Sequence, residues 1–284
     1  MREVQKAVGQ KCRLNLTKET EQRNILKNLY IRVKTEEQLS AVAEYIIRSR
    51  MLPEQLNILV PCHWTGTQVS LLSGRASVFA DLPYILRENI RRKAESCVKE
   101  AQWADGFVIK NIDEMGLVQE MDYQGKVIAD SFLYATNSQA MEFYRQQFEN
   151  IVFMASDELT DAEIDKMPEG KSLIYKIYGR QPVMFTAQDV AENYGTDGVV
   201  SLESAKRDRL VTSFDEFGFT TVYTEDAVSM MDKAAAWERD NILIDLTLEN
   251  KTETLEILGN VGEPAAEYTG VNSFSRGHHY RGID

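Results

Sequence analysis

Polar and charged residues follow several apolar runs of the sequence, and their types suit binding of an anionic substrate and transfer of a proton. Lys110 follows GFVI, Asp130 follows KVIA, and Arg180 follows SLIYKIYG. A lysine or arginine holds a negative charge, and a carboxylate in the same pocket can accept a proton. The further candidates of this kind are His63, Asp81, Asn111, Asn137, Ser156, Glu158, Tyr178, Asp245 and His278.

Several of these residues also have a purely structural interpretation. Asp130 is suited to pair with a lysine of a neighbouring strand. Asn137 is suited to the N-cap of the segment SQAMEFYRQQF, and Glu158 to the first turn of a helix, where the dipole stabilises a carboxylate. The residues alone leave both interpretations open.

Short β-branched or aromatic runs alternate with segments of helical periodicity, and this alternation predicts the scaffold. The runs are LYIRV (29–33), NILV (57–60), SVFA (77–80), GFVIK (106–110), KVIAD (126–130), NIVFMA (150–155), SLIYKIY (172–178) and NILIDLT (241–247). Such alternation implies parallel strands joined by crossovers. An open doubly wound sheet is the alternative, but no GxGxxG follows an early strand. We therefore expect an α/β fold, a (β/α)8 TIM-like barrel over residues 29–284.

One connection departs from this alternation. From Gly179 to about Glu225 the pattern has period two, and GVVSLES, DRLVTSF and FTTVYTE are typical of antiparallel strands. We expect a β-rich insertion at about 179–225, between the seventh and eighth strands, on the face where barrel active sites lie.

Arg180 lies where the seventh strand meets this insertion. Gly179 before it lets the backbone turn. A guanidinium at such an edge needs a partner, and Asp130, Glu158 or Asp208 are the candidates by topology. We expect Arg180 to pair with a carboxylate and to tie the insertion to the barrel, with substrate contact as a secondary role.

Composition restricts the class of protein. The chain is 43% hydrophobic and 27% charged, which is typical of a globular protein with a core. It has no apolar run of the roughly 20 residues that a membrane span needs, and no apolar signal core at its charged N-terminus. The 3 cysteines lie far apart, which excludes a disulfide framework. We expect a soluble, cytoplasmic protein without membrane contact, whose net charge of −12 disfavours broad nucleic-acid binding.

An ordered set of short words resembles the collagenase-like peptidase family, numbered thirty-two under the letter U. The words are FADLPYILRE (79–88), GFVIKNIDEM (106–115), VIADSFLYATNSQAMEFY (127–144), ASDELT (155–160), YGRQPVMFTAQ (178–188), KRDRL (206–210) and RGHHYRG (276–282). The resemblance implies that this chain is the C-terminal barrel of a longer protein, that its partner is the N-terminal part of that protein, and that the charged residues 1–28 form a linker helix at the junction. The barrel would then contribute binding of an RNA or protein substrate, or scaffolding. Members are catalogued as proteases, and some are implicated in hydroxylating RNA bases.

The sequence departs from this family at its cluster ligands. Relatives typically carry four cysteines for an iron–sulfur cluster after the YGR strand. Here Asp189 stands at the first expected place, and Val222 and Asp226 are nearest to two others. Carboxylates do not replace thiolates around such a cluster, so the expectation is no iron–sulfur cluster, no other cofactor and no metal.

Enzyme activity is left open by the sequence. There is no GxSxG and no HExxH motif. The side chains of the neighbours Cys62 and His63 point to opposite faces of a strand, so they are not suited to act as a nucleophile and its base. The alternative to a binding domain is a stand-alone hydrolase of the peptidase type that uses the polar residues after the strands.

Overall fold

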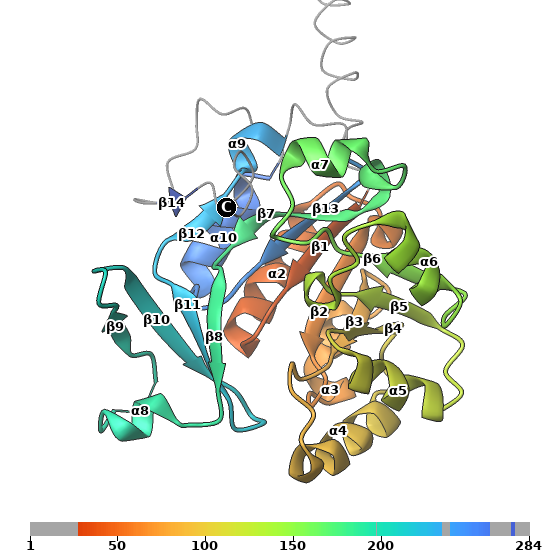
Figure 1. Cartoon of the computed structure of the whole chain (residues 1–284). Helices are drawn as coiled ribbons and strands as arrows, with labels where there is room; N and C mark the ends of the chain where they lie inside the picture. The colour runs from red at the N-terminus through yellow and green to blue at the C-terminus, as the bar shows by residue number, and fades with distance from the viewer. Residues whose placement is uncertain (1–27, 197, 235–238, 262–273, 276–284) are drawn as a thin grey trace, which may run out of the picture.

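The structure, a computed structural model, describes residues 28–196, 198–234, 239–261 and 274–275. Figure 1 shows a large curled sheet with helices around it and a smaller sheet beside it. Residues 1–27 of the predicted linker lie outside the described residues, so the linker helix stays a prediction.

Each of the eight predicted runs contains a strand. These strands are β1 (Asn28–Arg32), β2 (Leu56–Pro61), β3 (Ser77–Asp81), β4 (Gly106–Ile109), β5 (Lys126–Ala129), β6 (Ile151–Phe153), β7 (Ile174–Gly179) and β13 (Asn241–Asp245). They pair in parallel, in chain order from β1 to β6, and β13 lies between β1 and β7. Their carboxyl ends therefore meet at one edge of the sheet.

The predicted closed (β/α)8 barrel is wrong. The strands belong to a ten-stranded mixed sheet in the order β14-β12-β7-β13-β1-β2-β3-β4-β5-β6, where β14 is Phe274–Ser275. Strands β6 and β7 share one isolated bridge, between Met154 and Ile174, instead of a ladder. The reason is that Tyr178 and Gly179 of β7 pair antiparallel with β12 (Ala227–Ser229), while β13 occupies the other edge of β7. Of β7, only Ile174 bridges to Met154 after β6, and the sheet curls without closing.

Helices lie around this sheet and begin where the sequence supplies caps. The longer ones are α2 (Glu36–Arg48), α4 (Glu88–Glu100), α5 (Ile112–Glu120), α6 (Ser138–Arg145) and α10 (Lys251–Gly259), and the shorter ones are α3 (Gly66–Val69), α7 (Asp161–Lys166) and α9 (Met231–Ala234). Thr35 and Thr160 are the N-caps of α2 and α7, and both form capping boxes that satisfy backbone N–H groups of the first turn. In the described part, no helix combines the length and the apolar character that crossing a bilayer requires.

Residues between β7 and β12 form a separate sheet, which we call the insertion sheet. Its strands are β8 (Pro182–Thr186), β9 (Ser201–Glu203), β10 (Arg209–Phe214) and β11 (Thr220–Thr224), in the order β8-β11-β10-β9. All its pairs are antiparallel, and the short helix α8 (Val190–Asn193) follows β8. The segments GVVSLES, DRLVTSF and FTTVYTE thus contain antiparallel strands, as their period-two pattern predicts.

Two apolar layers surround the strands of the large sheet. The larger layer packs the outer face against the helices, with residues such as Ile31, Val42 and Leu258 at 0% exposure. The inner face carries a second cluster with one residue from each parallel strand or its end. These eight residues, which we call the apolar ring, are Tyr30, Leu59, Phe79, Val108, Ile128, Met154, Ile174 and Leu243.

Candidate functional site

A layer of charge lies directly beyond the apolar ring, toward the carboxyl ends of the strands. Side chains two residues apart on a strand share one face of the sheet. Six of the eight positions two residues after the ring are charged, and we call these six the charged layer: Arg32, Asp81, Lys110, Asp130, Lys176 and Asp245. The alternation of the strands thus brings together residues that lie up to about 200 positions apart in the chain.

Arg32 is the centre of the charged layer. Its Nη2 donates to Asp130, and its Nη1 donates to Oδ2 of Asp245 at 3.1 Å. Its Nε lies 3.2 Å from Oδ2 of Asp81, but without hydrogen-bond geometry, so this contact is electrostatic. The side chain of Arg32 is 8% exposed and that of Asp130 is 0% exposed. A buried guanidinium is therefore held by three carboxylates, from β3, from β13 and from the residue after β5.

The charges of this cluster stabilise one another against burial. Burial alone would lower the pKa of Arg32, but the charges of Asp81, Asp130 and Asp245 outweigh it and raise the pKa well above its usual range. Burial alone would raise the pKa of Asp130, but the charges of Arg32 and Lys110 and the hydrogen bonds it accepts lower that pKa overall. Both groups therefore stay ionised at neutral pH.

Lys110 and Glu114 extend the cluster behind Asp81. The Lys110 ammonium donates to Asp81 and to the Leu82 carbonyl. Oε2 of the fully buried Glu114 accepts the Lys110 backbone N–H at 2.5 Å, while its Oε1 has no hydrogen-bond partner among the described residues. Burial raises the pKa of Glu114 to about 8, although Lys110 opposes the shift. Glu114 therefore holds a proton at neutral pH.

A small cavity opens beside Arg32. It has a volume of about 20 Å³ and is lined by Arg32, Ser131, Phe132, Met154, Ala155, Asp157, Ile174, Lys176, Pro182, Leu243 and Asp245. A space of this size holds about one water molecule. Lys176 donates to Asp157 at 2.5 Å, and Oδ1 of Asp245 is buried without a hydrogen-bond partner among the described residues. The cavity thus has two cations, two carboxylates and an apolar wall.

The insertion sheet contacts residues at the carboxyl edge of the large sheet, and one of its residues lines this cavity. Phe185 of β8 stacks on Tyr84 with ring centroids 3.9 Å apart, and it meets the edge of Phe132 at 5.7 Å. The ammonium of Lys34, which follows β1, donates to the hydroxyl of Tyr223 in β11. Pro182 at the start of β8 lines the cavity itself. The insertion sheet thus contacts the large sheet here through side chains, and the two sheets share no strand ladder within the residues that the structure describes.

Phe217, in the turn between β10 and β11, gives a second set of such contacts. The ammonium of Lys93 lies 4.9 Å from its ring centroid and donates to the Glu216 carbonyl. His63 meets the same ring edge-on at 6.0 Å. Burial lowers the pKa of His63, so the imidazole is neutral at pH 7. The structure thus places His63 at the insertion sheet, away from the charged layer.

The other predicted site residues lie in several different places. Asp81, Lys110 and Asp130 belong to the charged layer. Asn111 and Asn137 accept backbone N–H groups as N-caps of α5 and α6. Glu158 is exposed and hydrogen-bonds to Tyr134. His278 lies outside the described residues.

Tyr178 and Arg180 form a separate centre around the buried Glu249. The hydroxyl of Tyr178 donates to Oε1 of Glu249 at 3.0 Å, and Arg180 donates to the same oxygen. Nε of Arg180 also donates to the Glu225 carbonyl at 3.1 Å, at the far end of the insertion. The predicted pairing of Arg180 with a carboxylate is confirmed, but the partner is none of the three residues expected. The ion pair between Arg180 and Glu249 therefore connects the insertion to the segment after β13.

Two residues of the charged layer were missed by sequence reasoning, Arg32 and Lys176. Arg32 is the single charged residue of the apolar run YIRV, and Lys176 is that of IYKIY. A single charge inside an apolar run is the sequence signal that could have identified both residues. Each lies two positions after a member of the apolar ring, Tyr30 or Ile174, so period two assigns both to the inner face. A buried charge in a strand requires partners, which the next strands supply.

Metal ligands are not gathered in the described part of the chain, where no group of three or more His, Cys, Asp or Glu residues is placed to hold an ion. Asp189, at the first expected cysteine position, caps α8 by accepting the Glu192 N–H at 3.0 Å. Cys62 and Cys97 are free and buried. The expectation that the chain takes no cofactor and no metal stays a prediction.

Comparisons with known proteins identify no family for this chain. No family model matches the chain, and no curated protein matches it. The crystal structure of an uncharacterized B. cereus protein is similar with a TM-score of 0.41 and 10% identity, and the match covers 86% of this chain and 66% of that one. The chain thus spans about two thirds of that protein's length, and a likeness at this level carries no argument. The resemblance to collagenase-like peptidases stays a prediction.

Proposed function

We propose that this chain binds a small zwitterion of the amino-acid type in the cavity between the charged layer and the insertion sheet. The observation that supports this is the lining of the cavity, with Arg32 and Lys176 as cations and Asp157 and Asp245 as carboxylates. A free amino acid carries a carboxylate for the cations and an ammonium for the carboxylates. Its side chain would lie against the apolar wall that includes Phe132.

Asp245 is the residue on which ammonium binding depends most. Its Oδ2 accepts from Arg32, while its buried Oδ1 lacks a partner among the described residues. A buried acceptor without a donor costs about 1–3 kcal/mol. An ammonium group in the cavity would satisfy it, so binding would remove a cost that the unliganded protein carries.

An amino acid is larger than the present cavity of about 20 Å³, so binding requires the insertion sheet to move. Aromatic and cation–π contacts such as Phe185 on Tyr84 and Lys93 on Phe217 are each worth about 0.5–1.5 kcal/mol. Contacts of this strength open more readily than a strand ladder. We infer that the insertion sheet is the cover of the site.

Binding is favoured over stand-alone hydrolysis because each carboxylate of the charged layer is already paired with a cation and is not available as a free general base. A protein-derived ligand is favoured over RNA because a net charge of −12 repels phosphates. Free, buried Cys62 and Cys97 fit a reducing compartment and support our proposal of a cytoplasmic location.

Thermal unfolding in the presence of each standard amino acid at about 10 mM tests the proposal. A ligand present at about ten times its Kd should raise the Tm by roughly 2–4 °C. The N-acetyl derivative and the methyl ester of the same amino acid, which lack the ammonium or the carboxylate charge, should leave the Tm unchanged. Equal shifts with these derivatives, or no shift with any amino acid, would contradict the proposal.

A further inference from the structure

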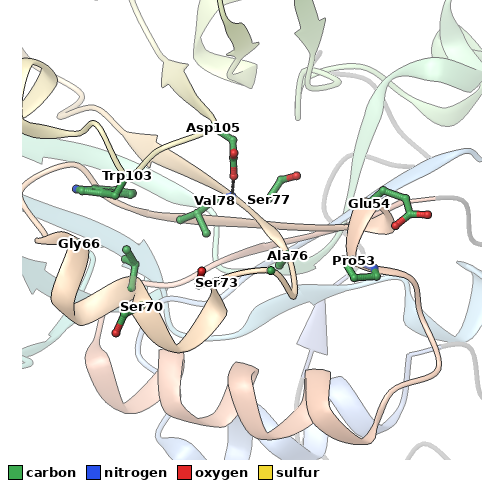
Figure 2. A pocket seen from close by; sticks show the side chains of 12 residues that line it. Pro53, Glu54, Gly66, Ser70, Ser73, Ala76, Ser77, Val78, Trp103 and Asp105 are labelled. Carbon is green, nitrogen blue, oxygen red and sulfur yellow. Dashed lines mark hydrogen bonds between the residues drawn. The ribbon is translucent and has the colours of Figure 1, made fainter.

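A second and larger cavity lies at the opposite edge of the sheet, near the amino ends of β3 and β4 (Figure 2). Its volume is about 630 Å³, and sites for small molecules typically have about 300–1,000 Å³. It shares no lining residue with the cavity beside Arg32. We call it the groove.

The two ends of the groove differ in chemistry. Figure 2 shows Trp103 at one end, Pro53 and Glu54 at the other, and Asp105 between them on the strand side. Trp103 packs against Gly66, where an added Cβ would lie 3.6 Å from the Trp103 Cβ. The Trp103 side chain therefore forms one wall of the groove and packs against the backbone of Gly66.

Asp105 is held in place by the backbone. One of its carboxylate oxygens, Oδ2, accepts the Val78 N–H at 2.7 Å, which Figure 2 shows as a dashed line. Its other oxygen, Oδ1, is not used in this bond. The structure also gives the hydroxyls of Ser73 and Ser77 no hydrogen-bond partner among the described residues. The groove thus offers acceptors at fixed positions.

The charge of the groove favours a cation. Its lining includes two carboxylates, Glu54 and Asp105, and no lysine, arginine or histidine. Lys126 is close enough to Asp105 to feel its charge, but its ammonium faces the rings of Tyr30 and Phe79, at 5.9 and 5.1 Å from their centroids. A site lined by one sign of charge concentrates ligands of the opposite sign.

We propose that the groove binds a small organic cation with a flat apolar group. The flat group stacks on the face of Trp103, and the ammonium donates to the carboxylate of Asp105. Serine hydroxyls accept the remaining N–H groups of the ammonium. This site is independent of the zwitterion site under the insertion sheet, because the two cavities have separate linings.

Binding of tyramine, followed by the NMR signals of the Trp103 indole N–H and the Asp105 backbone amide, tests this proposal. 4-Ethylphenol is the matched control, since it has the same ring but no ammonium. Tyramine should shift both signals, with a Kd at least about tenfold lower than that of 4-ethylphenol, because charge-assisted hydrogen bonds are the strong ones.

Asp105→Asn is the matched variant, because the asparagine oxygen can still accept the Val78 N–H and preserve the local fold. It should weaken tyramine binding at least about tenfold and leave 4-ethylphenol unchanged. The proposal is overturned if neither signal shifts at about 10 mM tyramine, if the two compounds bind equally, or if Glu54→Gln weakens binding while Asp105→Asn does not.

Discussion

At the scale of single residues, Arg32 is the residue on which the stability of the charged layer depends most. Its guanidinium is buried and contacts carboxylates of β3, β13 and the residue after β5. Removing one partner of a buried ion pair costs about 3–5 kcal/mol, because the other charges are left without compensation. Arg32→Ala should therefore lower the free energy of unfolding by at least that amount, measured by urea denaturation.

The control for this prediction is Arg48→Ala. Arg48 pairs with Glu44 on the surface of α2, and its side chain is 73% exposed. Such pairs contribute about 0–1 kcal/mol. Arg32→Lys should recover only part of the loss, because a lysine cannot donate to several carboxylates in a planar fork. A loss below about 1 kcal/mol for Arg32→Ala would show that the carboxylates are not held by this residue.

Glu114 predicts a specific dependence of stability on pH. Its pKa is raised from an ordinary value of 4.5 to about 8 in the folded protein, so the folded state holds a proton there that the unfolded state has lost. Its stabilising contribution is complete below about pH 4.5, falls as the pH rises toward 8, and is lost above it.

The slope from this one group is at most about 1.4 kcal/mol per pH unit. Glu114→Gln cannot ionise, so its free energy of unfolding should decline less between pH 5.5 and 8 than that of the wild type. Asp130 stays ionised throughout this window, because its pKa is lowered. Chemical denaturation at several pH values measures the difference, and parallel curves for the two proteins would refute the assignment.

At the scale of elements, Arg180 joins the insertion to the large sheet. Its side chain is 19% exposed, and that of its partner Glu249 is 3% exposed. Arg180→Ala should lower the free energy of unfolding by about 1–3 kcal/mol, and Arg180→Lys should restore only part of it. Arg209→Ala, which removes a 67% exposed side chain, is the control with little expected effect. Equal losses in the two alanine variants would contradict this role of Arg180.

Substitution of Phe185 tests whether the insertion sheet opens independently of the large sheet. Phe185→Ala removes the stack on Tyr84 and the edge contact with Phe132. Amide hydrogen exchange should accelerate in residues 182–224 and stay unchanged in β1 to β5, because local opening follows local contacts. Uniform acceleration across both sheets would show that they unfold as one unit.

Elements could be predicted from the sequence where the signal is local. The apolar runs correspond to strands because β-branched residues fill both faces of a buried parallel strand. Pairing of β12 with Tyr178 and Gly179 is a contact between segments about 50 residues apart, and no period in either segment indicates it. For that reason, the sequence does not predict that the sheet stays open. Asp81, Lys110 and Asp130 were found because they follow runs, whereas Arg32 lies inside one.

At the scale of the whole molecule, the structure separates two kinds of surface. Ion pairs and a small covered cavity lie at the carboxyl edge of the strands, and the open groove with Trp103 lies at the amino edge. The central claim is that an amino-acid-type zwitterion binds at the first of these. Its ligand would contact residues from β1, β7 and β13, which are adjacent in the sheet.

Mapping amide NMR shifts on addition of free amino acids is the measurement that tests this claim most directly. The account predicts that at least one amino acid shifts the signals of Arg32, Asp157, Lys176 and Asp245, together with β8 of the cover. Asp245→Asn should remove these shifts, because it replaces the carboxylate proposed to hold the ammonium. Shifts confined to Trp103 and Asp105, or an unchanged response in Asp245→Asn, would contradict the account.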